Sequence, residues 1–250
     1  MQYLGGKART HKQIAGYLNG VRRSEQAYWE PMVGAAWILQ AVYGGRRYAG
    51  DLNPYLVAMW QAIQAGWIPP SAVTEQEYLA IKDSPGNYPK ELVAFVGFGC
   101  SFGGKWFAGY ARAGSRNYAS NARNSVLSKR GRLSDVNFAV TNIFTSRPPE
   151  ENCLIYLDPP YRGTTGYRAV GGFDSNAFWG RVRELANSGH VVVVSEYQAP
   201  SDFECILSMT TKTDMHTRNG KEGRTECLFT PAAFRHLLNV KQLDFWGSVE

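Results

Sequence analysis

Two almost uninterrupted apolar runs constrain the fold of this chain more than any other feature. They are residues 153–157, Cys-Leu-Ile-Tyr-Leu, and residues 191–194, four consecutive valines. A strand that is buried on both faces has such a continuous apolar sequence, which is typical of parallel sheets covered by helices. Residues 178–186 between the two runs are predicted to form the crossover helix. We therefore predict an α/β fold around a parallel sheet.

Strand and helix signals alternate at both ends of the chain but not in its middle. The middle part, residues 66–135, is punctuated by turn dipeptides such as Pro69-Pro70 and Pro85-Gly86, which favour short helices and loops. We expect one sheet domain formed by residues 1–65 and 136–250, with the middle part as an inserted lobe. The other strands are predicted over residues 26–33, 46–49 and 136–140, and the other helices over residues 10–20, 37–42 and 56–64.

Composition narrows the class of protein. The chain has 250 residues, of which 44% are hydrophobic and 19% charged, and this balance excludes a disordered chain. No apolar stretch is long enough to span a bilayer, and the amino terminus does not resemble a signal peptide. The four cysteines and four histidines lack the spacing of metal ligands. We expect a cytoplasmic protein without membrane segment or metal, and the formal charge of +6 favours an anionic partner such as nucleic acid.

The strongest chemical signal is the tetrapeptide Asp158-Pro159-Pro160-Tyr161, which directly follows the apolar run 153–157. Ligands of open α/β sheets bind beyond the carboxyl ends of the strands, where this tetrapeptide is expected to lie. The two prolines stiffen the turn and remove backbone donors, which leaves carbonyl oxygens free to accept hydrogen bonds. The aspartate adds another acceptor, and the tyrosine adds a flat face. The combination predicts a site for an amino group on a planar ring, whereas Pro-Pro alone is typical of an ordinary turn.

The longer stretch 158–167, with Thr164 and a second tyrosine at Tyr167, resembles the Dam-like DNA adenine N6-methyltransferases of the D12 class. The resemblance implies a Rossmann-like sheet that binds S-adenosylmethionine and a recognition lobe that binds double-stranded DNA. It also implies site-specific methyl transfer to N6 of a flipped adenine, as in restriction–modification systems. By this resemblance the catalytic residues are Asp158, Pro159, Pro160 and Tyr161, and Asp158 also faces the cofactor.

A second match to this family is the turn Glu30-Pro31-Met32-Val33-Gly34-Ala35-Ala36. An acid, a proline and a glycine between a strand and a helix are typical of cofactor-binding turns in Rossmann-like sheets. By resemblance, Glu30, Pro31 and Gly34 bind S-adenosylmethionine, although Met32 stands where the family has an aromatic residue and Ala36 where it has glycine. The last glycine position matters because a methyl group there limits the approach of backbone to ligand.

Asp51 lies 21 residues beyond Glu30, at the end of the second predicted strand. This spacing is close to the offset of ~20 residues at which a carboxylate accepts hydrogen bonds from ribose hydroxyls. We therefore predict that Asp51 binds the cofactor. The alternative is that Asp51 is the N-cap of the helix that follows.

The amino-terminal segment Tyr3-Leu4-Gly5-Gly6-Lys7 resembles the family's motif of an aromatic residue followed by Gly-Gly-Lys. The resemblance implies that Tyr3, Gly5, Gly6 and Lys7 line the methionine end of the cofactor, and that Lys7 reaches toward the target site. A nucleotide-phosphate loop is excluded because the required spacing of glycines is missing. The alternative is a flexible basic tail.

Basic residues gather in the predicted lobe. Between Cys100 and Ser134 the chain has no acid, and aromatic residues such as Trp106 and Phe107 lie among the cations. This mixture is typical of surfaces that contact phosphates and stack on bases, and the family has its target-recognition region at this place in the chain. The alternative is a solvated basic face. The residues predicted to bind DNA are Lys105, Arg112, Arg116, Arg123, Lys129 and Arg130.

Three weaker expectations concern the second half of the chain. Phe173 and Phe178-Trp179 are expected either to pack against the methionine part of the cofactor or to belong to the core. Ser195-Glu196-Tyr197 follows the valine run and is expected to line the adenine pocket. Residues 224–229 resemble a late strand of the family.

Three alternatives to DNA adenine methylation stay open. One is methylation of adenine in RNA, where asparagine more often begins the tetrapeptide, and another is N4-cytosine methylation, where serine usually does. The third is a DNA-binding relative that has lost catalysis. C5-cytosine methylation is excluded because none of the four cysteines follows a proline, the setting of the cysteine nucleophile in that reaction.

Overall fold

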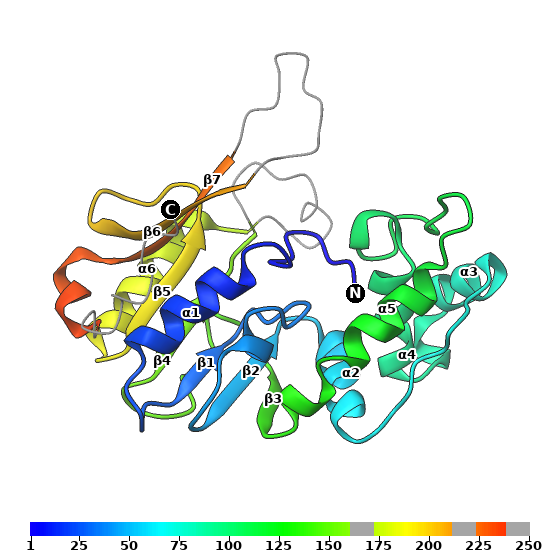
Figure 1. Ribbon diagram of the computed structural model, residues 1–250, viewed down its shortest axis with the longest axis horizontal. Coiled ribbons are helices and arrows are strands. Elements are labelled where there is room, and N and C mark those ends of the chain that lie inside the picture. The colour runs from blue at the N-terminus through cyan, green and yellow to red at the C-terminus, as the bar shows by residue number, and fades with distance from the viewer. Residues whose placement is uncertain (161–172, 212–223, 239–250) are drawn as a thin grey trace, which may run out of the picture.

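The computed structural model describes residues 1–160, 173–211 and 224–238. Its centre is a seven-stranded sheet with the order β3-β2-β1-β4-β5-β7-β6 (Figure 1). The first five strands of this order are parallel, and β7 runs antiparallel to both β5 and β6. The strands are β1 (Tyr28–Glu30), β2 (Arg47–Asp51), β3 (Val136–Val140), β4 (Leu154–Leu157), β5 (Val191–Glu196), β6 (Phe203–Thr211) and β7 (Arg224–Pro231). The predicted Rossmann-like α/β fold is confirmed.

Local sequence explains where the helices begin. The Asn53 side chain accepts hydrogen bonds from the amides of Tyr55 and Leu56, and Pro54 occupies the first turn of α2, where a missing amide costs nothing. Asp174 caps α6 in the same way. The helices are α1 (His11–Val21), α2 (Pro54–Gln64), α3 (Glu75–Asp83), α4 (Lys90–Ala94), α5 (Tyr118–Leu127) and α6 (Ser175–Asn187). Shorter turns are η1 (Leu39–Ala41), η2 (Pro85–Asn87), η3 (Phe95–Gly99), η4 (Phe102–Gly104), η5 (Arg130–Leu133) and η7 (Ala232–Leu237).

The sheet buries side chains on both faces, as the apolar runs predict. Along β4, Leu154 and Tyr156 pack into one hydrophobic cluster, and Ile155 and Leu157 pack into another. The first cluster includes residues of α1 and α2, and the second includes residues of α6. Accordingly, α1 lies in front of the strands and α6 lies behind them in Figure 1. The alternation follows from the two-residue period of a strand.

The segment 66–135 leaves the sheet after α2 and returns at β3. The structure describes every residue of this segment, and they form helices, turns and loops without contributing a strand to the sheet. This helical part lies beside the β3 edge (Figure 1). Its Val93 and Phe95 belong to the same hydrophobic cluster as Trp60 and Ile63 of α2. The boundaries of a separate recognition lobe therefore stay a prediction, because the segment shares a core with its neighbour.

The helix predicted over residues 37–42 is wrong. Only the short turn η1 forms there: the amides of Ala41 and Val42 both donate to the Ile38 carbonyl, and the backbone becomes extended at Val42. The guanidinium of Arg47 donates to the carbonyls of Leu39 and Val42, and that of Arg22 donates to Tyr43 and Gly44. Two arginines thus satisfy carbonyls in and after this short turn.

The described parts of the chain contain no helix that combines the length and the apolar character needed to cross a bilayer.

Candidate active site

The candidate site lies where the strand order reverses. From β1 the chain continues to β2 and β3 on one side, whereas β4 and β5 extend the sheet on the other side. Such a switch point leaves a crevice beyond the carboxyl ends of the two central strands. A cavity of about 810 Å³ lies here, bordered by Glu30 after β1 and by Asp158 after β4. Its other walls come from segments 3–10, 31–35, 37–38, 51–52, 141–144 and 159–160, and from Phe173, Asp174, Tyr197 and Glu226.

The tetrapeptide reaches this cavity as far as it is described. Asp158, Pro159 and Pro160 line the cavity, and the Asp158 side chain is 21% exposed. Tyr161, the fourth predicted catalytic residue, lies outside the described residues, as do Thr164 and Tyr167.

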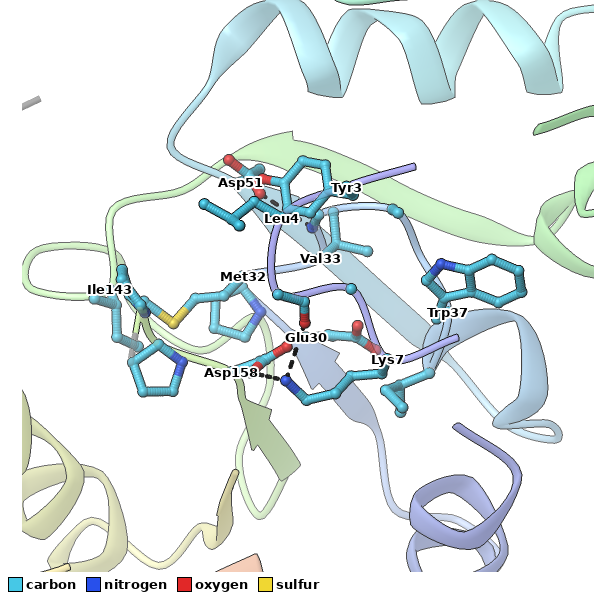
Figure 2. A pocket seen from close by; sticks show the side chains of 18 of the residues that line it. Tyr3, Leu4, Lys7, Glu30, Met32, Val33, Trp37, Asp51, Ile143 and Asp158 are labelled. Carbon is cyan, nitrogen blue, oxygen red and sulfur yellow. Dashed lines mark hydrogen bonds and ion pairs between the residues drawn. The ribbon is translucent and has the colours of Figure 1, made fainter. Parts of the chain in front are cut away.

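Lys7 joins the amino-terminal segment to the tetrapeptide. Its ammonium nitrogen lies 2.6 Å from Asp158 Oδ1 and 3.3 Å from Glu226 Oε1, and it also donates to the Gly5 carbonyl (Figure 2). Burial lowers the pKa of Lys7, but the negative charges of Asp158 and Glu226 outweigh burial, so the net shift is upward and Lys7 stays charged. Tyr3, Gly5 and Gly6 line the same cavity. This segment is therefore part of the cavity wall and not a flexible tail.

The predicted cofactor turn faces the cavity from β1. Glu30 is 2% exposed and accepts a hydrogen bond of 2.7 Å from the Tyr28 hydroxyl. Burial raises the pKa of Glu30 to about 8, although the Tyr28 hydrogen bond opposes the shift. Gly34 adopts a φ of 46°, and a Cβ built there would lie 2.8 Å from the Tyr3 ring. Glycine is therefore required at this position for both its conformation and its size.

Asp51 ties the end of β2 to this turn. Its carboxylate accepts hydrogen bonds from the amides of Gly34 at 3.1 Å and Asn53 at 3.0 Å, and it lines the cavity. Burial raises the pKa of Asp51 to about 6 against the effect of these hydrogen bonds. Because Asn53 is the N-cap of α2, the N-cap alternative for Asp51 is wrong.

Apolar side chains form the side walls of the cavity. Met32 and Ile143 lie next to each other on the side of Asp158, and Trp37 lies at the opposite end beyond Lys7 (Figure 2). Phe173 also lines the cavity, 5.8 Å from the ring of Phe144.

The weaker expectations are resolved in part. Phe178 and Trp179 are buried in the core cluster behind the sheet, so for these two rings core packing is the correct alternative. Tyr197 lines the cavity, and the adenine pocket expected at the segment 195–197 stays a prediction. Ser195 contributes indirectly, because its hydroxyl donates to Glu226 Oε1 at 2.7 Å.

Sequence reasoning missed Glu226 as a site residue. This residue lies on β7, is 6% exposed and lines the cavity beside Lys7. The signal available was an acid inside the apolar strand pattern of residues 224–229, because a buried carboxylate requires a partner. The loop 141–144 was also missed, although it follows a predicted strand and so belongs to the same edge of the sheet.

Five of the six residues predicted to bind DNA reach the surface of the segment 66–135. Arg112, Arg116 and Arg130 are exposed, and Lys105 and Arg123 are half-buried. Arg112 pairs with Glu75 of α3, and its guanidinium lies 5.9 Å from the centre of the Tyr110 ring. These five remain predictions, because no nucleic acid contact tests them.

The prediction for Lys129 is wrong. Its side chain is fully buried, its ammonium nitrogen lies 2.5 Å from the Ala35 carbonyl, and it stands 3.7 Å from the centre of the Trp37 ring. Burial lowers the pKa of Lys129 to about 7. Lys129 therefore supports the cofactor turn from below and presents no charge to a phosphate. The absence of acids from this stretch does not show which of its cations face inward.

Within residues 1–160, 173–211 and 224–238, histidine, cysteine, aspartate and glutamate form no group of three or more that could hold a metal ion.

Solved structures of methyltransferases and related enzymes show a distant similarity to this chain. No protein-family model matches it, and no curated protein sequence matches it. It is similar to the rRNA methyltransferase AviRa from Streptomyces viridochromogenes, with 14% identity over 89% of this chain and 85% of that chain and a TM-score of 0.40. The N-methyltransferase NodS from Bradyrhizobium japonicum WM9, in complex with S-adenosyl-L-homocysteine, gives 9% identity, coverage of 89% and 86%, and a TM-score of 0.41. Precorrin 8W decarboxylase from Methanobacterium thermoautotrophicum shares 8% identity with this chain over 92% of each chain, with a TM-score of 0.42. TM-scores this low assign neither activity nor substrate.

Proposed function

We propose that this chain is an S-adenosylmethionine-dependent methyltransferase that acts on the amino group of a nucleic acid base. The favoured target is N6 of a flipped adenine in double-stranded DNA, and the favoured compartment is the cytoplasm. One observation carries the proposal: Asp158, Pro159 and Pro160 line the same cavity as Glu30 and Asp51. Acceptors for an amine and carboxylates suited to a nucleoside cofactor thus share one space at the switch point of the sheet.

The chemistry of the cavity fits the cofactor. S-adenosylmethionine supplies a methyl group bound to a positively charged sulfur atom. Asp51 stands at the end of β2, where a carboxylate is suited to accept hydrogen bonds from ribose hydroxyls. The volume of about 810 Å³ lies within the range of sites that enclose small-molecule ligands. The residues proposed to hold the cofactor are Tyr3, Gly5, Gly6, Lys7, Glu30, Pro31, Gly34, Asp51 and Asp158.

The tetrapeptide is suited to activate an aromatic amine. The lone pair of such a nitrogen is delocalised into the ring, so the nitrogen is a weak nucleophile. The Asp158 carboxylate and the Pro159 carbonyl are proposed to accept its two N–H groups, which favours a pyramidal nitrogen and stabilises the positive charge that develops on it. Tyr161, by resemblance, stacks on the base, which must leave the duplex to expose its amino group.

The proposed polymer partner is DNA, on two observations. Exposed arginines such as Arg112 and Arg116 lie in a stretch without acids, which suits the phosphate backbone. Aspartate at position 158 favours adenine in DNA, because this position is more often asparagine in enzymes that methylate adenine in RNA and usually serine in N4-cytosine methyltransferases. RNA adenine, N4-cytosine and an inactive DNA-binding relative become outcomes of the test.

Methyl transfer from radiolabelled S-adenosylmethionine to duplex DNA and to RNA tests this proposal, with mass spectrometry of the digested bases. We expect N6-methyladenine in DNA, and a loss of at least ~100-fold in rate for Asp158→Ala because a transition-state acceptor is removed. Asp83→Ala, which changes an exposed aspartate on α3, is the matched control and should keep the full rate.

Other outcomes would replace the proposal. Label in RNA only would assign an RNA enzyme, and N4-methylcytosine would assign the cytosine reaction. A folded protein that transfers no label to either polymer would contradict enzymatic methylation.

A further inference from the structure

Two carboxylates share one buried ammonium group in the candidate site. Lys7 Nζ lies between Asp158 at 2.6 Å and Glu226 at 3.3 Å, and the Lys7 side chain is only 5% exposed. The three residues come from the amino-terminal segment, from the end of β4 and from β7. An isolated Lys7–Asp158 pair would already neutralise both charges, so the second carboxylate needs a reason.

The Glu226 carboxylate, like the Lys7 ammonium, is buried and hydrogen-bonded. Its side chain is 8% exposed, and Oε1 accepts the hydroxyl of Ser195 from the neighbouring strand β5. This hydrogen bond helps to hold the carboxylate beside Lys7. The carboxylate therefore offers the ammonium a second acceptor inside the cavity.

The second carboxylate changes the charge of the site. Lys7 with Asp158 alone would carry no net charge, whereas Lys7 with both acids carries one net negative charge. The other acidic and basic side chains that border this cavity are Arg9, Glu30, Asp51 and Asp174. Since burial raises the pKa of Glu30 to about 8, Glu30 holds its proton at neutral pH and adds no charge in the empty site.

We infer that Glu226 is a positioning residue that shares the Lys7 ammonium with Asp158 and adds one negative charge to the cavity. The cavity thereby favours a cationic sulfonium over a neutral thioether. The inference rests on the proposed function, because it assigns Glu226 a part in that same site.

A charge cycle tests this role through ligand binding, without turnover. Calorimetry measures the affinities of cationic S-adenosylmethionine and neutral S-adenosylhomocysteine for the wild type and variants. We expect Glu226→Gln to shift the preference toward the neutral ligand by ~10-fold or more, because one charge at short range is lost. The double variant Lys7→Met/Glu226→Gln keeps Asp158 as the net negative charge and should restore the preference. Glu204→Gln, on the neighbouring strand β6, is the matched control and should change nothing.

Two further readouts separate positioning from a merely structural role. The apparent pKa of the Lys7 ammonium, followed by nitrogen NMR in the ligand-free protein, should fall in Glu226→Gln. In turnover, kcat should fall ~10-fold while KM for nucleic acid changes little, and Glu226→Asp should recover part of kcat because it restores the charge.

The outcomes are distinguishable. If the wild type is active but Glu226→Gln keeps the wild-type preference, Glu226 has no such role. If Glu226→Gln does not fold, the double variant is measured instead, and its failure to show the wild-type preference leads to the same conclusion. If the folded wild type binds neither ligand, the proposed function itself fails, and the inference fails with it.

Discussion

At the scale of single residues, the acids around the cavity divide into two kinds. Asp158 is partly exposed and meets the Lys7 ammonium at 2.6 Å, so its charge is compensated. Glu30 is enclosed, and it accepts a hydrogen bond from the neutral hydroxyl of Tyr28. Burial therefore favours the protonated form of Glu30, whose pKa rises to about 8. The two acids lie at the ends of neighbouring strands, yet Asp158 pairs with an ammonium group and Glu30 with a neutral hydroxyl.

Glu30→Gln should remove a pH dependence of stability. Because the pKa of Glu30 rises from 4.5 unfolded to about 8 folded, the native protein holds an extra proton between these values, and wild-type stability is lost as pH rises through that window. The loss should be on the order of a few kcal/mol. Glutamine keeps an acceptor for Tyr28 and has no proton to lose. Urea unfolding at pH 5.5 and pH 8.5 measures the difference.

The control for this prediction is Glu151→Gln, which changes an exposed acid. It should leave the pH dependence of the wild type intact. Equal pH slopes for Glu30→Gln and the wild type would mean that Glu30 is ionised in the folded protein throughout this range.

The sequence identifies residues whose surroundings are local. Asp158, Glu30 and Asp51 could be predicted because each follows a strand whose carboxyl end borders the switch point. Glu226 was missed and Lys129 was assigned to the wrong role, because the environments of both residues are made by distant segments. The Ala35 carbonyl and the Trp37 ring enclose Lys129, and Lys7 approaches Glu226 from the other end of the chain.

At the scale of elements, two helices contain glycines that do nothing visible for packing. Gly16 in α1 and Gly180 in α6 each leave open space at the position of a Cβ atom. We expect Gly16→Ala and Gly180→Ala each to raise the free energy of unfolding by about 0.5–1 kcal/mol, because alanine loses less backbone entropy in a helix. Denaturant unfolding at constant m-value measures the gain.

Gly34→Ala is the contrasting variant. The same addition of one methyl group meets the Tyr3 ring at 2.8 Å and a φ of 46°, so stability should fall. A gain in stability at Gly34 equal to that at Gly16 would show that the turn at residue 34 tolerates a side chain.

Elements with strong apolar periodicity were predicted well. The strand predicted over residues 136–140 coincides with β3, and the two apolar runs became β4 and β5. The edge strand β6 was missed because exposed residues such as Glu204 and Ser208 interrupt its apolar pattern. The strand predicted over residues 26–33 shrinks to Tyr28–Glu30, because Pro31 has no amide to continue the ladder.

At the scale of the whole molecule, nucleic acid binding should depend on salt through the exposed cations of the segment 66–135. Arg116→Ala and Lys105→Ala should each reduce the slope of log affinity against log salt by ~0.9, and weaken all duplex sequences alike. Fluorescence anisotropy across a salt series measures both effects. Arg46→Ala, just before β2 at the opposite end of the strands, should leave the slope unchanged. Unchanged slopes for all three variants would exclude this face as the phosphate contact.

The shared core beside α2 has a consequence for how such a protein changes its target. The root of the segment 66–135 is fixed by Gln64, whose amide donates to the carbonyls of Leu133 and Val136, and Phe95 packs in the cluster that holds Trp60. A relative that received the segment alone would lack the α2 side chains against which the segment packs, so part of the apolar core would be exposed. Under the proposed function, we therefore expect a change of target to come from substitutions in the exposed loops of the segment, because its interior is shared with the sheet domain.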